Sequence, residues 1–78
     1  MMITSKRQAR QAIENGEIEV GTLLTSVEGT YQVTAINPKS NLAVEAVEVE
    51  FTEEGEVIPF RPENTYRWTL ADLEQMEF

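Results

Sequence analysis

The spacing of apolar side chains near the start of the chain predicts a short helix. Three apolar residues lie three and four positions apart, which is the spacing of one helix face: Ala9, Ala12 and Ile13. Thr4 or Ser5 suits the N-terminal cap, and Ser5–Gln8 fits a capping box in which Gln8 reaches back to the cap amide. Gly16 suits a left-handed C-terminal cap. Because the apolar stripe is narrow and poor in large side chains, we expect residues 1–16 to form an arm that lies loosely at the domain edge. Removal of residues 1–15 is then expected to cost little stability.

Beyond the helix, apolar and polar residues alternate with a period of two, which is typical of strands. The alternation predicts five strands: Thr22–Val27, Thr30–Ile36, Leu42–Phe51, Val57–Phe60 and Thr65–Thr69. Glu28–Gly29 is predicted as a two-residue hairpin turn, because glycine supplies the positive φ that such turns require. Proline and asparagine mark a longer turn at Asn37–Asn41.

The third predicted strand carries apolar residues on both of its faces. They form two triplets, the first at even and the second at odd positions: Leu42, Val44, Ala46 and Val47, Val49, Phe51. An extra residue near Ala46–Val47, a β-bulge, would turn both triplets inward and bend the strand. We therefore expect both triplets to be buried and the strand to curl the sheet.

Together these elements predict a single, mainly β domain over residues 1–78. Five short antiparallel strands separated by turns favour a sheet that closes into a barrel within residues 17–70. Over residues 20–70 the order of strands resembles the Src-homology-3-like and Tudor-like small barrels, a resemblance of pattern without a family motif. Thr69–Asp72 forms a second capping box, which begins a short helical turn within residues 70–78.

Charge is distributed unevenly along the chain. Its 78 residues include 14 acidic and 6 basic side chains, for a net charge of -8. Residues 1–10 carry +3 from 3 cations, whereas residues 11–78 carry -11 from 3 cations and 14 carboxylates. This balance opposes binding to nucleic acid or to an anionic membrane. Since there is no cysteine and no stretch of about 18 consecutive apolar residues, we expect a soluble cytoplasmic protein.

The residue types present exclude most catalytic chemistry. There is no histidine and no cysteine, so Ser-His catalysis, Cys-His catalysis and zinc binding all lack their groups. The glycines are scattered and form no phosphate-binding loop. Glu48 and Glu50 lie two apart on one strand face, yet acid–base catalysis needs a desolvating cleft that so small a barrel rarely offers. We expect no enzymatic activity, no cofactor and no bound metal.

One candidate surface is a series of glutamates without an intervening cation: Glu45, Glu48, Glu50, Glu53, Glu54 and Glu56. A strand that presents a carboxylate at every second residue spaces the charges about 6.6–7 Å apart, close to the phosphate spacing along one nucleic-acid strand. Such a face would imitate nucleic acid and occupy a basic groove of a partner. The same residues equally suit a solvated strand edge whose charge repulsion prevents aggregation.

A second candidate surface combines aromatic and basic side chains near the end of the chain: Phe60, Arg61, Tyr66, Arg67 and Trp68. Exposed aromatic residues on a small barrel can line a groove for a peptide. The two arginines either pair with nearby glutamates or bind an acidic ligand group. We expect Tyr31 and Phe51 to lie in the core, while Phe60 and Trp68 suit either the core or the surface.

Two hypotheses of function follow from these surfaces. In the first, the chain is a small acidic protein-binding domain that docks on the basic, nucleic-acid-binding surface of a partner. Short acidic chains without cysteine occur among phage and mobile-element inhibitors, and this chain resembles them in amino-acid composition. In the second, the chain is an interaction or scaffold module of Src-homology-3-like or Tudor-like type that reads a peptide through its aromatic groove. Both hypotheses predict a protein partner, no direct binding to nucleic acid or membrane, and a monomer or weak homodimer.

Overall fold

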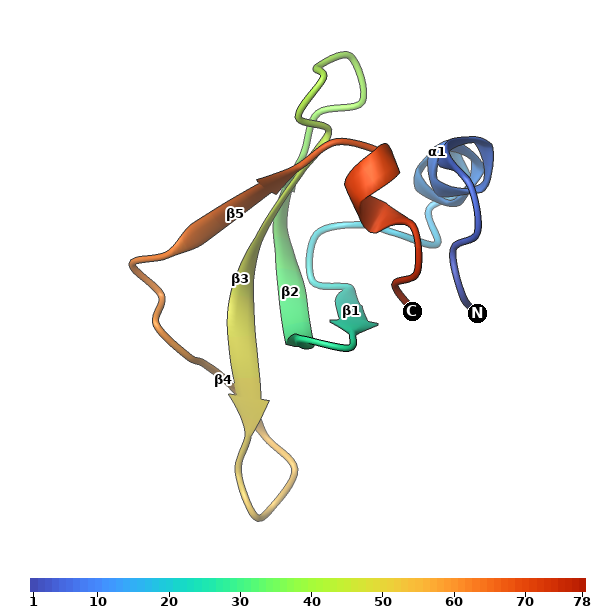
Figure 1. The fold of residues 1–78 in the computed structure, drawn as a ribbon. Coiled ribbons are helices and arrows are strands. Elements are labelled where there is room, and N and C mark those ends of the chain that lie inside the picture. The colour runs from blue at the N-terminus through green and yellow to red at the C-terminus, as the bar shows by residue number, and fades with distance from the viewer.

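Five antiparallel strands, one α-helix and one short 3-10 helix form the computed structural model, which describes residues 1–78 (Figure 1). In chain order the elements are α1 (Lys6–Glu14), β1 (Leu23–Ser26), β2 (Gly29–Ile36), β3 (Val44–Phe51), β4 (Val57–Pro59), β5 (Thr65–Trp68) and the 3-10 helix η1 (Ala71–Leu73). All five strands belong to one sheet. The predicted class, a mainly β domain with a short helix and a C-terminal helical turn, is confirmed.

The central strand of the sheet is β3. One of its edges pairs with β2, and its other edge is divided between β5, which pairs with Val44–Val47, and β4, which pairs with Val49–Phe51. Because both are antiparallel to β3, β4 and β5 run in the same direction, as one strand interrupted by residues 60–64. No pairing joins β1 to β5, so the sheet is not closed and the predicted barrel is not confirmed.

The β-bulge predicted near Ala46–Val47 lies in the neighbouring strand instead. The register between β2 and β3 shifts between Val33 and Ala35, so the extra residue is Thr34 of β2. β3 pairs without interruption through the position predicted to bulge. An extra residue in either strand bends an antiparallel pair, so the apolar pattern of β3 alone does not decide which strand carries it.

Only part of each apolar triplet in β3 is buried. Val44, Ala46 and Val49 lie in the interior, but Leu42 is 44% exposed and Phe51 is 53% exposed. Leu42 precedes β3, and Phe51 lies beyond the last residue of β3 that pairs with β2. The prediction that Phe51 belongs to the core is wrong, because only the short β4 accompanies this end of β3.

The turn between β1 and β2 comes one residue earlier than predicted. Ser26 faces Gly29 in the register, which leaves Val27 and Glu28 as the turn residues in place of Glu28–Gly29. Neither turn residue has a positive φ, whereas Gly29 begins β2 with a φ of 156°. The N–H of Glu28 donates to Oγ of Ser26 over 3.1 Å, so a serine side chain stabilises the turn next to the glycine.

The two ends of α1 agree with their sequence signals. Ser5 caps the helix, and its Oγ accepts a hydrogen bond from the N–H of Gln8 over 3.1 Å. The Gln8 side chain reaches back to Thr4 rather than to the predicted cap amide, since the N–H of Thr4 donates to Oε1 of Gln8 over 2.7 Å. Gly16 follows the helix with a φ of 76°, as a left-handed cap requires.

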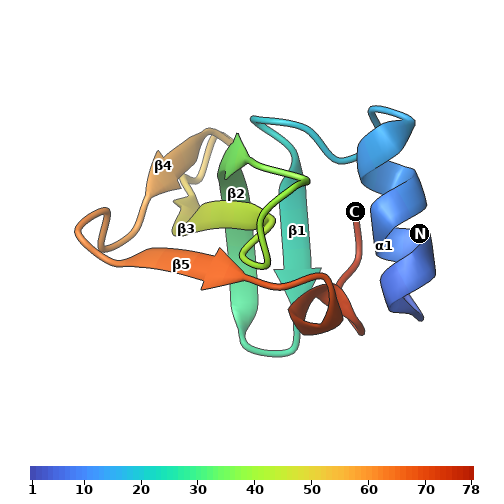
Figure 2. The ribbon, with the colours of Figure 1, turned by 90° about the horizontal axis from the view of Figure 1, so that it is seen from above.

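The N-terminal arm belongs to the core. Ten buried residues form one cluster: Ile3, Ala9, Ala12, Ile18, Leu24, Val33, Ala43, Val44, Leu73 and Met76. The C-terminal segment lies between β1 and the N-terminal residues (Figure 2), where Glu77 and Thr25 exchange two backbone hydrogen bonds of 2.8 Å and the N–H of Ile3 donates to Met76 O over 2.8 Å. The expectation of a loosely placed arm is wrong. The alanines of α1 allow close packing, and large side chains outside the helix fill the interior.

Candidate functional site

Three aromatic side chains meet on one face of the sheet, which we call the inner face. This face is defined by alternate residues of β3: Val44, Ala46 and Glu48. The ring centroid of Tyr31, from β2, lies 5.1 Å from that of Tyr66 and 5.0 Å from that of Trp68, both from β5. Tyr31 is 5% exposed, as predicted for a core residue, and the other two rings are half-buried. Rings in such direct contact form a packed cluster and leave no groove between them.

The environment of Tyr31 disfavours its ionised form. Burial raises the pKa of Tyr31 above its ordinary value of 10.0, and electrostatic interactions with Tyr66 and with the carboxylates of Glu48 and Glu28 raise the pKa further. A hydrogen bond with the Ser26 side chain lowers the pKa, but by less than burial raises it. The Tyr31 hydroxyl therefore stays protonated at neutral pH, beside carboxylates from two different segments of the chain.

The raised pKa of Tyr31 predicts a specific loss of stability in alkali. In the unfolded chain the hydroxyl ionises near pH 10.0, before it does so in the folded protein. Between the two pKa values the free energy of unfolding should therefore fall as pH rises, by up to about 1.4 kcal/mol per pH unit. Urea unfolding from pH 8 upward should show a shallower fall for Tyr31→Phe than for the wild type. Equal slopes for the wild type and Tyr31→Phe would contradict the assignment.

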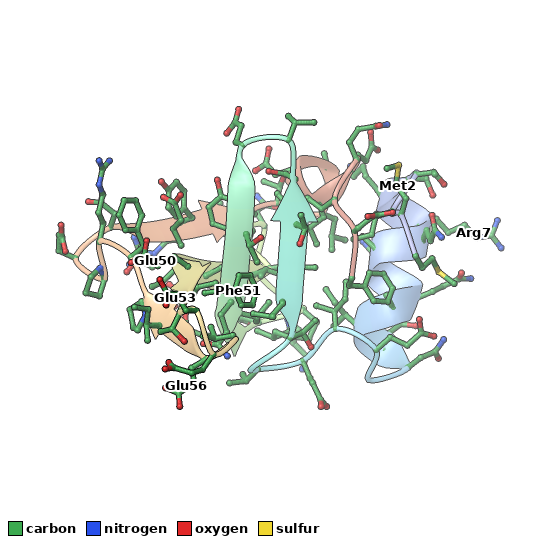
Figure 3. All side chains as sticks on the ribbon, turned by 90° about the horizontal axis from the view of Figure 1, so that it is seen from below. Met2, Arg7, Glu50, Phe51, Glu53 and Glu56 are labelled. Carbon is green, nitrogen blue, oxygen red and sulfur yellow. The ribbon has the colours of Figure 1, made fainter.

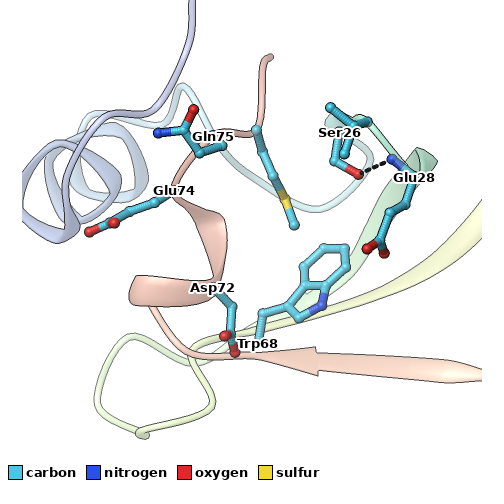
Figure 4. A pocket seen from close by; sticks show the side chains of 8 residues that line it. Ser26, Glu28, Trp68, Asp72, Glu74 and Gln75 are labelled. Atoms are coloured by element: carbon cyan, nitrogen blue, oxygen red, sulfur yellow. Dashed lines mark hydrogen bonds between the residues drawn. The ribbon is translucent and has the colours of Figure 1, made fainter.

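A cavity of about 370 Å³ lies next to the aromatic cluster, where β1 and β5 fail to pair. Its lining comes from the β1–β2 turn, the end of β5 and the segment from η1 to the C-terminal residues: Ser26, Val27, Glu28, Trp68, Asp72, Glu74, Gln75 and Met76. Figure 4 shows the Trp68 indole between the side chains of Asp72 and Glu28. Three of the lining residues are acidic and none is basic, so the cavity has a negative potential.

Sequence reasoning missed most of this cavity, because its residues come from three segments that are far apart in the chain. Of the lining residues, only Trp68 belongs to a surface predicted from the sequence. The predicted capping box at Thr69–Asp72 is present, since the N–H of Thr69 donates to Oδ2 of Asp72 over 2.9 Å. One sequence signal could have pointed to an acidic site here. The chain after Arg67 contains three carboxylates and no cation: Asp72, Glu74 and Glu77.

The six glutamates of the predicted acidic face do not form one row. Glu48 and Glu50 lie on the inner face, and Glu45 lies on the opposite, outer face of β3. There Glu45 pairs with Arg67, whose Nε donates to Oε1 over 2.8 Å. An exposed pair of this kind contributes under about 1 kcal/mol, but it neutralises Glu45 and removes that residue from the acidic surface.

Glu50 and the three glutamates that follow it in the chain gather at the end of the β3–β4 hairpin, which projects from the sheet (Figure 1). We call this end the acidic tip and define it by five residues: Glu50, Phe51, Glu53, Glu54 and Glu56. Figure 3 shows Glu50, Glu53 and Glu56 near Phe51 and away from Arg7 of α1. All five residues are exposed, and no cation lies within ion-pair distance of their carboxylates. The tip is therefore an uncompensated negative surface that contains an exposed aromatic ring.

The second candidate surface divides into separate contacts. Tyr66 and Trp68 join Tyr31 in the packed cluster described above. Arg67 points to the other face, and Arg61 lies over the half-buried ring of Phe60, with its guanidinium carbon 5.0 Å from the ring centroid. The five predicted residues do not line a common groove.

Comparisons of the chain with protein-family models, with curated proteins and with solved structures find no match. The structure contains no helix with the length and apolar character needed to span a bilayer. Its acidic side chains form no group of three that is arranged to hold a metal ion. The acidic tip and the acidic cavity are therefore the two features from which a function is inferred.

Proposed function

We propose that the chain is a small non-enzymatic protein-binding domain whose acidic tip docks on the basic surface of a protein partner. The observation that supports this proposal is the composition of the tip. Phe51 is 53% exposed at the end of a projecting hairpin, and the carboxylates near it are not neutralised by any cation. Protein interfaces are enriched in aromatic residues at their centre and in polar groups at their rim, and the tip offers both, with Phe51 on the outer face of β3 and Glu50 on the inner face.

The charge of the tip suits fast and selective encounter with a cationic surface. Complementary potentials steer a partner during diffusion and raise the association rate. A partner surface that binds nucleic acid carries the required positive charge, so we propose that the tip competes with nucleic acid for such a surface. An inhibitor of a nucleic-acid-handling protein, of the kind that phages and mobile elements encode, would act in this way.

The alternative, a peptide-binding module with a Src-homology-3-like or Tudor-like barrel, has less support. It requires an open groove made by aromatic side chains. Tyr66 and Trp68 instead pack against Tyr31 with ring centroids at 5.1 and 5.0 Å. A closed barrel would also require β1 to pair with β5, and the sheet contains no such pairing.

Differential capture tests the proposal with a matched control. Immobilised wild-type chain is compared with two triple variants that change the net charge equally: Glu50→Lys, Glu53→Lys, Glu56→Lys at the tip, and Glu14→Lys, Glu17→Lys, Glu19→Lys near the end of α1. All six positions are exposed and none of these carboxylates accepts a hydrogen bond within the chain. A true partner should be retained by the wild type and by the α1 variant and lost with the tip variant. Equal loss with both variants would mean that only net charge matters and would overturn the proposal.

A further inference from the structure

We propose that the cavity between the β1–β2 turn, β5 and η1 receives one arginine side chain of the protein partner. This inference rests on the proposed function, since it names a residue type that the partner's basic surface would present. It concerns a different part of the molecule from the acidic tip, so the two can be tested separately. The cavity lies on the side where β1 and β5 do not pair and where the C-terminal segment instead pairs with Thr25 of β1.

The cavity supplies negative charge from two sides. Glu28 comes from the β1–β2 turn and Asp72 comes from η1, on either side of the Trp68 indole, whereas the Glu74 side chain points away from the indole (Figure 4). Asp72 uses Oδ2 to accept from the Thr69 N–H, so its other carboxylate oxygen is free of protein bonds. The carboxylate of Glu28 forms no ion pair or hydrogen bond within the chain. A cation entering here would gain charge-assisted hydrogen bonds without breaking an existing pair.

The indole of Trp68 makes a guanidinium the best-suited cation. Trp68 lines the cavity between the acidic side chains (Figure 4). A guanidinium is planar, stacks on aromatic rings and binds carboxylates through two parallel hydrogen bonds, whereas an ammonium is a compact and strongly hydrated charge. A metal ion fits less well, because these acidic residues do not converge as a metal-binding group.

The inner face connects the cavity with the acidic tip. The Glu48 carboxylate and the Tyr31 hydroxyl both lie beside Gly29, the residue that follows Glu28 in the chain. Along β3, Glu50 follows Glu48 on the same face and begins the tip. One basic segment of a partner can therefore contact the cavity and the tip together, with an arginine in the cavity.

Trp68 is the only tryptophan of the chain, so its fluorescence reports on the cavity directly. The probe is the peptide acetyl-Gly-Arg-Gly-amide, compared with the same peptide carrying citrulline, which has a similar shape and no charge. The arginine peptide should produce a saturable change with a dissociation constant in the millimolar range. The citrulline peptide should bind at least about tenfold more weakly. The chemical shift of the Trp68 indole N–H is followed in parallel, so that binding without a fluorescence change is still detected.

Two double variants with equal charge change decide whether binding occurs in the cavity. Glu28→Gln with Asp72→Asn should weaken binding of the arginine peptide about tenfold; asparagine keeps an oxygen that can accept from the Thr69 N–H. Glu50→Gln with Glu53→Gln, at the tip, should leave its affinity unchanged. Equal binding of the arginine and citrulline peptides, an unchanged affinity for the cavity variant, or equal weakening by both variants would each overturn the inference. If the proposed function fails instead, the tip variant will not affect capture of the partner, whatever the arginine peptide does.

Discussion

Removal of residues 1–15 is expected to abolish the cooperative unfolding transition of this domain. The deletion takes Ile3, Ala9 and Ala12 out of a cluster of ten buried residues. It also breaks the backbone bonds that join Ile3 to Met76 and Gln75, and so frees the C-terminal segment that lies along β1. A small domain has about 5–15 kcal/mol of total stability, which is comparable with the loss expected from several buried residues.

A single substitution tests the same contact in a chain that still folds. Ile3 is 0% exposed, so Ile3→Ala should lower the free energy of unfolding by about 2–5 kcal/mol, as measured by urea denaturation. Arg7→Ala, at an exposed position of α1, is the control and should change stability by less than about 0.5 kcal/mol. A deletion variant that unfolds cooperatively with nearly wild-type stability would show that the arm is not required by the core.

Reversing three charges of the acidic tip is expected to have the largest effect on partner binding. Glu50→Lys, Glu53→Lys, Glu56→Lys should lower the association rate constant by about 10–100-fold at low ionic strength, because the tip would then repel a basic surface. The difference from the wild type should shrink as salt is added, since the Debye length falls to about 8 Å at physiological ionic strength. Stopped-flow or biosensor kinetics with the purified partner measure both quantities.

The aromatic residue of the tip should affect a different rate constant. Phe51→Ala removes the exposed ring and leaves the charge unchanged, so it should raise the dissociation rate about tenfold or more while the association rate changes little. The triple variant at Glu14, Glu17 and Glu19 should retain wild-type kinetics. Binding that is independent of salt and of all three tip charges would contradict electrostatic docking.

The secondary structure could be predicted from the sequence, because helix caps, turns and apolar alternation each depend on residues that are close together in the chain. The cap at Ser5 and the glycine at Gly16 mark α1 within two residues of its observed ends. The alternating residues likewise predict all five strands, with ends that differ by up to two residues. The β1–β2 turn is displaced by one residue and the β-bulge lies in β2 instead of β3. Packing was harder to predict. The buried position of α1 depends on Ile3 and on the C-terminal segment, which the apolar stripe of the helix does not reveal.

The candidate surfaces were harder to predict, because they depend on which strands pair with one another, and the sequence of a single strand does not determine this. Alternation within β3 separates Glu45 from Glu48, but only the pairing with β5 places Arg67 beside Glu45. The packed cluster around Tyr31 likewise requires β2 and β5 to lie on opposite sides of β3. The acidic cavity arises where the sheet remains open, a property of the whole topology.

The most direct test of the proposed docking surface is a titration of the isotope-labelled chain with the captured partner, followed by backbone-amide NMR. Docking through the acidic tip predicts that the amide signals of residues 50–58 shift or broaden first and most strongly. Signals near the Glu45–Arg67 pair on the outer face and on the exposed surface of α1 should change little. Changes confined to the outer face or to α1, with the signals of residues 50–58 unaffected, would contradict it.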